Sequence, residues 1–264
     1  MYAFEYHHPR TLSGALADLA KDEAKALAGG MTLLPTMKQR LASPSSLVEL
    51  TGIPELTGLS RDGDNIVIGA MTRHVEVARS PVVRGAIPAL ANLAGGIGDP
   101  HVRNRGTIGG SLANNDPAAD YPAAALGLGA TIVTNKRRIA ADDFFKGLFE
   151  TALDANELIT QVSFPVPQKA GYMKFANQAS RYALVGVFVA KTAAGVRVAV
   201  TGAGQNGVFR VPAFESALNA NFAPTALDGL SVPADGLNSD LHADAAYRAH
   251  IVGVMARRAV AAAG

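Results

Sequence analysis

The chain has 264 residues, enough for about two compact units at roughly 150 residues each, and a net charge of +2. It contains no cysteine, which excludes disulfides, cysteine-ligated zinc and iron–sulfur clusters held by this chain. The near-neutral charge balance does not predict nucleic-acid binding. Only 17% of the residues are charged, against about 25% in an average soluble domain, which favours a surface partly covered by a partner.

The first 50 residues alternate short helices and strands. Residues 11–20 carry apolar side chains at 12, 15, 16 and 19, a spacing that predicts a helix. A strand is expected at 25–28, a second helix at 32–41 and another strand at 47–50. Strands joined by such short helical crossovers predict a small parallel sheet.

From residue 66 onward the pattern is more mixed. We expect a strand at 66–70, a helix over 82–93 interrupted at Pro88, and a loop rich in Gly, Asn and Asp at 95–116. Asp116 followed by Pro117 is typical of a helix start. A hairpin is expected at 131–140 and a strand at 158–164.

Two prolines, Pro165 and Pro167, mark the best domain boundary. Strands at 172–175, 184–191 and 196–201 follow, with helices at 214–218 and about 242–262. These patterns predict an α+β protein of three units: an N-terminal α/β lobe (1–55), a larger α+β lobe (56–167) and a C-terminal domain (168–264) with a three-stranded antiparallel sheet and helices.

The first glycine-rich segment runs from Ala28 to Thr32, between a predicted strand and a helix. Its paired glycines allow the backbone to approach a ligand closely, and the helix start offers free N–H groups to a pyrophosphate. An ordinary strand-to-helix turn is the alternative interpretation.

The second segment, from Gly106 to Ser111, is followed by a run of amides and carboxylates up to Asp120. Convergent polar groups beside exposed backbone favour a bound polar ligand, whereas an Asx-turn and cap cluster would explain Asn115 and Asp116 alone. His101 could line this site or be a plain loop residue.

Other motifs of catalysis or metal binding are absent from the sequence. Residues 202–207 match the pattern G-x-G-x-x-G, but an extended segment follows where a dinucleotide fold needs a helix. There is no G-x-S-x-G, H-E-x-x-H or Walker A sequence, and the six histidines show no ligand spacing. We therefore predict neither a metal site nor catalytic residues in this chain.

The two glycine segments together resemble a known family. A-G-G-M-T at 28–32 and T-I-G-G-S at 107–111 are similar to the flavin motifs of the FAD-binding medium subunits of molybdenum hydroxylases, the xanthine dehydrogenase and carbon monoxide dehydrogenase group. The run N-N-D-P-A-A-D-Y-P at 114–122 is close to the carbon monoxide dehydrogenase branch. The resemblance covers nearly the whole chain and implies two lobes that hold FAD between them, closed on one side by the C-terminal domain.

The resemblance also implies the residues that bind the cofactor. The segments around the two motifs would hold the diphosphate and ribityl region, and Tyr182 would lie near the isoalloxazine ring. The full expected set is Leu27, Ala28, Gly29, Gly30, Met31, Thr32, Leu33, Leu34, Ile97, Thr107, Ile108, Gly109, Gly110, Ser111, Asp120, Lys174 and Tyr182.

The function implied by the resemblance is electron transfer. FAD, bound without a covalent link, would accept electrons from two [2Fe–2S] clusters on a small partner subunit and pass them to an external acceptor. A large partner would carry the molybdenum–pterin cofactor and the substrate, in a dimer of heterotrimers, that is, a heterohexamer. Neither a signal peptide nor a membrane span is visible, so we expect a cytoplasmic protein, with association through a membrane-bound acceptor left open.

Two alternatives stay open at this point. One is a self-contained FAD reductase of the same fold, which would need an acid and a hydroxyl proton donor directed at the flavin. The other is a non-redox nucleotide-binding scaffold subunit. The substrate, whether carbon monoxide, an N-heterocycle or an aldehyde, is not encoded in this chain.

Overall fold

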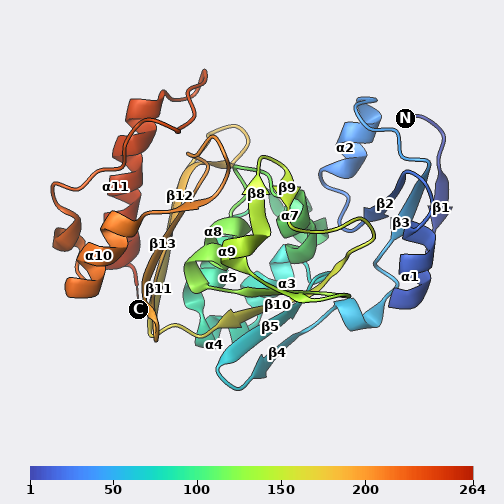
Figure 1. The fold of residues 1–264 in the computed structure, drawn as a ribbon, viewed down its shortest axis with the longest axis horizontal. Helices are drawn as coiled ribbons and strands as arrows, with labels where there is room; N and C mark the ends of the chain where they lie inside the picture. The colour runs from blue at the N-terminus through green and yellow to red at the C-terminus, as the bar shows by residue number, and fades with distance from the viewer. Residues whose placement is uncertain (264) are drawn as a thin grey trace.

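The structure is a computed structural model that describes residues 1–263, and its three main sheets succeed one another along the molecule (Figure 1). Each sheet is built from one continuous part of the chain. The N-terminal sheet lies at one end, a five-stranded sheet in the middle and a four-stranded sheet with the C-terminal helices at the other end. Separate hydrophobic clusters pack against them.

The N-terminal sheet is parallel, as the alternation of helices and strands predicts. It pairs in the order β1–β3–β2, with β1 at Glu5–His7, β2 at Ala24–Leu27 and β3 at Ser46–Glu49. The connecting helices are α1 (Leu12–Leu19) and α2 (Leu33–Lys38). The Thr11 hydroxyl accepts a hydrogen bond from Gly14 N (3.2 Å) and so caps the start of α1.

The middle sheet is antiparallel, in the order β4–β5–β10–β6–β7. A strand hairpin and a set of short helices pack around it. The elements of this region are η1 (Pro54–Leu56), β4 (Leu59–Asp62), β5 (Asn65–Gly69), α3 (His74–Arg79), α4 (Pro81–Ala86), α5 (Pro88–Gly95), α6 (Pro100–Arg105), α7 (Ile108–Asn114), α8 (Tyr121–Leu128), β6 (Thr131–Thr134), β7 (Arg138–Ala140), α9 (Ala141–Phe144), β8 (Phe145–Gly147), β9 (Glu150–Thr151) and β10 (Ile159–Pro165). The predicted break at Pro88 is confirmed, because Pro88 begins α5.

The C-terminal sheet contains the three predicted strands and one short addition. Its strands are β11 (Lys169–Ala176), β12 (Ala183–Thr192), β13 (Gly195–Thr201) and the two-residue β14 (Phe209–Arg210), all antiparallel. The helices of this region are α10 (Pro212–Ala220), η2 (Pro224–Leu227) and α11 (Ala245–Ala261).

Helix α8 connects the middle region to the C-terminal sheet. All eight of its residues are buried, as expected for a helix that is apolar on every side. It contacts β12 and β13 of the C-terminal sheet as well as β10 of the middle sheet. The start of this helix therefore lies at a junction between two regions of the chain.

Two sequence expectations in this part of the chain are wrong. The stretch 95–116 is not a single loop, because it contains helices α6 and α7. Asp116 does not start a helix: its carboxylate accepts a hydrogen bond from Ala118 N (2.8 Å) in a tight turn, and the next helix begins at Tyr121.

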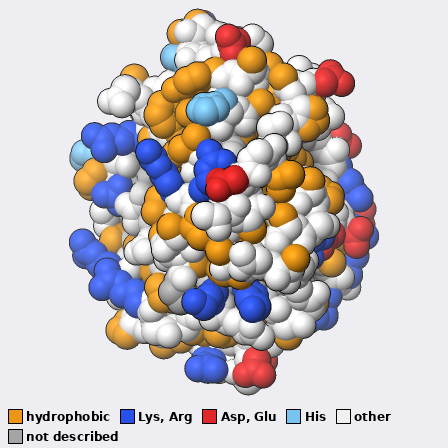
Figure 2. All heavy atoms as spheres, turned by 90° about the vertical axis from the view of Figure 1, so that its left-hand side faces the viewer, with side chains coloured by type: hydrophobic (Ala, Val, Ile, Leu, Met, Phe, Trp, Pro, Cys, Tyr) orange, Lys and Arg blue, Asp and Glu red, His pale blue; other side chains and the backbone are white. Residues whose placement is uncertain are grey.

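The outer face of the C-terminal region is shown in Figure 2. Hydrophobic side chains are scattered over its centre, lysines and arginines gather along the left side and the lower margin, and acidic side chains lie mostly along the right-hand edge and at the top and bottom. Leu230, Leu241 and Tyr247 are among the exposed large apolar residues of this part of the chain. The expectation that a partner covers part of the surface stays a prediction.

Candidate functional site: a cavity where the three regions meet

A cavity of about 640 Å³ lies where segments of all three regions converge. Its walls come from the turn after β2, the starts of α3, α6 and α7, the segment before α8, the approach to β10 and the loop between β11 and β12. The volume falls within the range of about 300–1,000 Å³ that is usual for small-molecule sites. The two glycine motifs, 79 residues apart from Ala28 to Thr107, both line it.

The first glycine segment presents a row of unused backbone donors. Among the described residues, the N–H groups of residues 29–33 donate no hydrogen bond to the protein. Gly30 has a φ of +73°, a conformation that favours glycine, and this turns the chain from β2 into α2. Five successive free donors at the wall of a cavity suit an anionic ligand.

Gly29 also joins the two glycine motifs. A Cβ atom placed on it would lie 2.2 Å from the carbonyl oxygen of Arg105. The missing side chain therefore lets this turn lie directly on the backbone between α6 and α7. Close packing of the two motifs is therefore by itself enough to require glycine at this position.

The second motif forms the first turn of α7. The Thr107 hydroxyl caps the helix by accepting from Gly110 N (3.1 Å), and the N–H groups of Ile108, Gly109 and Ser111 also have protein acceptors. A Cβ on Gly109 would lie 2.6 Å from the Cβ of Ala70, so this glycine lets α7 pack against the end of β5. The motif thus builds the wall, and Gly110 and Ser111 face the cavity.

Asp120 is a buried carboxylate in the cavity wall, with a relative exposure of 4%. Lys174 forms an ion pair with it (Nζ to Oδ1, 2.9 Å), and the Tyr172 hydroxyl donates a hydrogen bond to it. Burial raises the pKa of the Asp120 carboxyl, while the charge of Lys174 and these hydrogen bonds oppose the rise.

His74 lines the cavity but was missed by the sequence analysis. Its ring packs against Tyr121 with centroids 5.3 Å apart. Burial, and then the positive charge of Arg103, lower the pKa of His74 to about 4, so the ring is neutral at pH 7. A lone histidine without ligand spacing gave no signal, because its neighbours are distant in the sequence.

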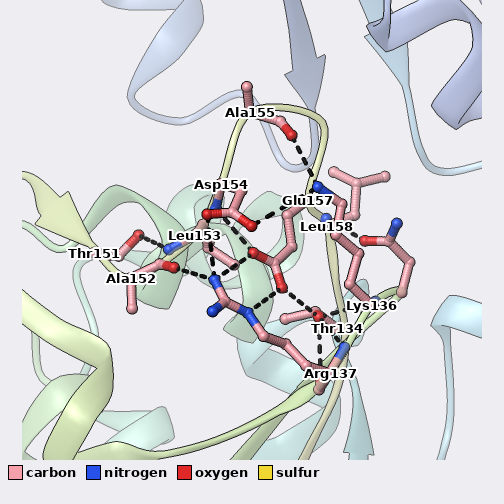
Figure 3. A network of polar contacts seen from close by, with 11 residues as sticks. Thr134, Lys136, Arg137, Thr151, Ala152, Leu153, Asp154, Ala155, Glu157 and Leu158 are labelled. Carbon is pink, nitrogen blue, oxygen red and sulfur yellow. Dashed lines mark hydrogen bonds and ion pairs between the residues drawn. The ribbon is translucent and has the colours of Figure 1, made fainter.

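The loop that closes the cavity near β10 is held by the network in Figure 3. The Glu157 carboxylate accepts a bidentate pair from Arg137 (3.0 and 2.9 Å) and further hydrogen bonds from Thr134 and the backbone N–H of Asp154. The hydrogen bonds from Arg137, first among these contacts, lower the pKa of Glu157 to about 2. The network fixes the turn that places Leu153 and Leu158 in the wall.

The structure brings most of the predicted cofactor residues together. Those that line the cavity are Leu27, Ala28, Gly29, Gly30, Met31, Thr32, Leu33, Ile97, Thr107, Gly109, Gly110, Ser111, Asp120 and Tyr182. Leu34, Ile108 and Lys174 are not among the lining residues, and neither is His101. Lys174 lies behind Asp120, with which it forms an ion pair.

Comparison with known proteins identifies the family. Residues 2–167 match the model of the FAD binding domain in molybdopterin dehydrogenase. The chain belongs to this family.

Relatives in the family span nearly all of the chain. The carbon monoxide dehydrogenase medium chain of Hydrogenophaga pseudoflava is 36% identical (98% of this chain and 96% of that protein), and the nicotine 6-hydroxylase medium subunit of Paenarthrobacter nicotinovorans is 38% identical (99% and 98%). Among solved structures, CO dehydrogenase from Oligotropha carboxidovorans superposes with a TM-score of 0.90 at 32% identity (99% and 97% covered). Quinoline 2-oxidoreductase from Pseudomonas putida 86 superposes with a TM-score of 0.88 at 29% identity, over 98% of this chain and 96% of that chain. The chain is therefore an FAD-binding component of an oxidoreductase, similar to carbon monoxide dehydrogenase medium chains.

The cavity fits the cofactor that the family implies. FAD carries an anionic diphosphate, which the free N–H groups of residues 29–33 suit, and an extended apolar ring system, which the apolar parts of the wall suit. In residues 1–263 every helix is too short or too polar to cross a membrane.

Proposed function

We propose that this chain is the electron-transfer subunit of a molybdenum hydroxylase. It takes electrons from the [2Fe–2S] clusters of a small partner subunit and delivers them to an external acceptor. The observation that carries this proposal is the cavity built by two glycine motifs, with five free backbone donors on one wall, in a chain of the FAD-binding family. The proposed units are residues 1–55, 56–167 and 168–264.

The residues of the cavity suggest how the cofactor is held. Residues 29–33 donate their N–H groups to the diphosphate, and Thr107, Gly110 and Ser111 border the ribityl region. Tyr182, which is about half exposed, covers the ring system. Bound FAD supplies the redox chemistry, and the protein supplies binding, orientation and the electrostatic environment. This division of roles requires no general base or nucleophile from the chain.

The choice of substrate belongs to a partner in this proposal. Relatives with nearly equal identity to this chain are named for carbon monoxide and for nicotine, and a structural neighbour is named for quinoline. A subunit that contacted the substrate would have to differ more among such enzymes. We therefore place the molybdenum centre on a large partner, in a cytoplasmic heterohexamer of two heterotrimers.

The test is to purify the complex from its native source and to remove FAD from part of it. Iron–sulfur absorption should bleach in both samples when the large-subunit substrate is added, while only the FAD-loaded sample should reduce an added acceptor dye. Equal dye reduction without FAD would overturn the electron-transfer role. Full substrate turnover by the isolated chain would instead support a self-contained reductase.

A further inference from the structure

Strand β11 sends two side chains toward the cavity from outside residues 2–167, the part of the chain that matches the family model. Tyr172 and Lys174 are two positions apart, so they lie on the same face of the strand. Both contact the carboxylate of Asp120, which lies 52 residues before Tyr172 and 54 residues before Lys174 in the sequence. The strand therefore contributes to this site two polar groups that lie outside the residues matched by the FAD-binding family model.

Lys174 also holds a second segment of the wall. Its ammonium donates to the carbonyl oxygen of Gly96 at 2.8 Å, directly before Ile97 and Gly98, which line the cavity. The side chain of Lys174 is 11% exposed, and neither it nor Tyr172 is a lining residue. One buried ammonium thus ties the carboxylate and the 97–98 turn together from behind.

From this geometry we infer that Tyr172 and Lys174 are positioning residues for FAD that act through Asp120. They fix the Asp120 carboxylate at the cavity wall and favour its ionised form, in which it accepts a hydrogen bond from a donor group of the cofactor. The inference rests on the proposed FAD site.

Electrostatics supports the same assignment. A buried carboxylate without a cation takes up a proton at higher pH, because burial disfavours the charged form. The titratable groups around Asp120 are Tyr172 and Lys174 on β11, Tyr121 beside it on α8, Asp116 before α8, Tyr182 before β12, and His74 against Tyr121. Among these groups, Lys174 is the cation whose charge lowers the pKa of Asp120.

The chain offers a matched control for the connection between regions. Arg197 on β13 also connects the C-terminal sheet to the middle region: it donates to the Leu126 carbonyl of α8 at 2.8 Å and forms an ion pair with Asp142 of α9 at 2.8 Å. Neither residue of that ion pair lines the cavity. Arg197→Met therefore removes a comparable connection without touching Asp120.

The experiment measures FAD affinity against pH by the quenching of flavin fluorescence, using the full chain. Asp120→Asn should bind FAD about tenfold more weakly at neutral pH, with no titration from this site. In Lys174→Met, the affinity for FAD should fall as the pH is lowered, and the midpoint of this fall should lie about 1–3 pH units above the wild-type midpoint. Tyr172→Phe should move the midpoint in the same direction by less, and Arg197→Met should leave it in place.

Each result decides the inference. The inference would be overturned if the pH midpoint of FAD affinity were the same in Lys174→Met and Tyr172→Phe as in the wild type. It would also be overturned if Arg197→Met moved this midpoint as far as Lys174→Met does, because the effect would then come from weakened contacts between the regions in general. Circular dichroism checks that each variant is folded, and Tyr172→Phe, which keeps the ion pair, carries the test if Lys174→Met does not fold. A wild-type chain that takes up no FAD at all would instead refute the proposed function.

Discussion

Replacing Gly29 with alanine tests how the two glycine motifs build the site. The added Cβ would lie 2.2 Å from the Arg105 carbonyl oxygen and 2.7 Å from the Gly106 Cα. A carbon–oxygen contact needs about 3.3 Å, so the two backbones must separate by about 1 Å. Because the obstructing atoms are backbone, no side-chain rotation relieves the contact.

Two losses should follow from that separation. Over-packing of this kind costs about 1–3 kcal/mol of the free energy of unfolding, and the rigid contact favours the upper end. In the proposed FAD site, displacing the N–H groups of residues 29–33 should remove at least one charge-assisted hydrogen bond to the diphosphate, worth about 1.5–3 kcal/mol. FAD affinity should therefore fall by about tenfold to a hundredfold.

Urea unfolding followed by circular dichroism, with and without FAD, measures both effects. Gly85→Ala is the control, because no heavy atom lies within 4 Å of its Cβ position in α4. It should stabilise the chain by about 0.5–1 kcal/mol and leave FAD binding unchanged. If Gly29→Ala unfolded at the wild-type urea concentration and bound FAD within twofold, the packing argument would be refuted.

Three further predictions use other parts of the site. Thr107→Ala should lower the free energy of unfolding by about 1 kcal/mol through loss of the α7 cap, measured by urea titration; an unchanged midpoint would contradict this role. Ionised Glu157 contributes up to about 3 kcal/mol to the free energy of unfolding above pH 4.5, and this contribution is lost as the pH falls toward about 2. Glu157→Gln should therefore be less stable near neutral pH, and its free energy of unfolding should change less with pH over that acidic range. As the pH falls, His74 is protonated in the unfolded chain near pH 6.5 but in the folded chain only near pH 4. The free energy of unfolding should therefore fall by up to about 3 kcal/mol between these pH values, and His74→Gln should remove this pH dependence. Equal acid profiles of variant and wild type would count against either titration argument.

Local signals in the sequence predicted much of the fold. Thr11 and the apolar spacing of α1 describe a capped amphipathic helix, and the short crossovers fix a parallel N-terminal sheet. The hairpin of β6 and β7 was predicted in the same way, from two short apolar strands around a turn. Each depends on residues close together in the chain.

The failures occurred where two local signals compete. Asp116–Pro117 looks like a helix start, yet Asp120, one residue before Tyr121–Pro122, precedes the real helix. The side chain of Asp116 is used in a turn instead. In the same way Thr107, a good N-cap, was hidden in a segment whose glycines suggested a loop.

The polar parts of the site are mostly non-local. Asp120 meets Lys174 across 54 residues, and Glu157 meets Arg137 across 20. No periodicity or motif encodes such pairs, because packing of separate sheets decides them. The family resemblance named Asp120 and Lys174 as cofactor residues, but it gave no sign of the ion pair between them, which the structure shows.

The central claim is that this chain accepts electrons from an iron–sulfur partner through FAD. The most direct measurement mixes the FAD-loaded chain anaerobically with the reduced small subunit and follows the flavin absorption by stopped flow. Flavin absorption should bleach as the clusters reoxidise, with one FAD reduced per chain. Flavin that stays oxidised in a formed complex would contradict it.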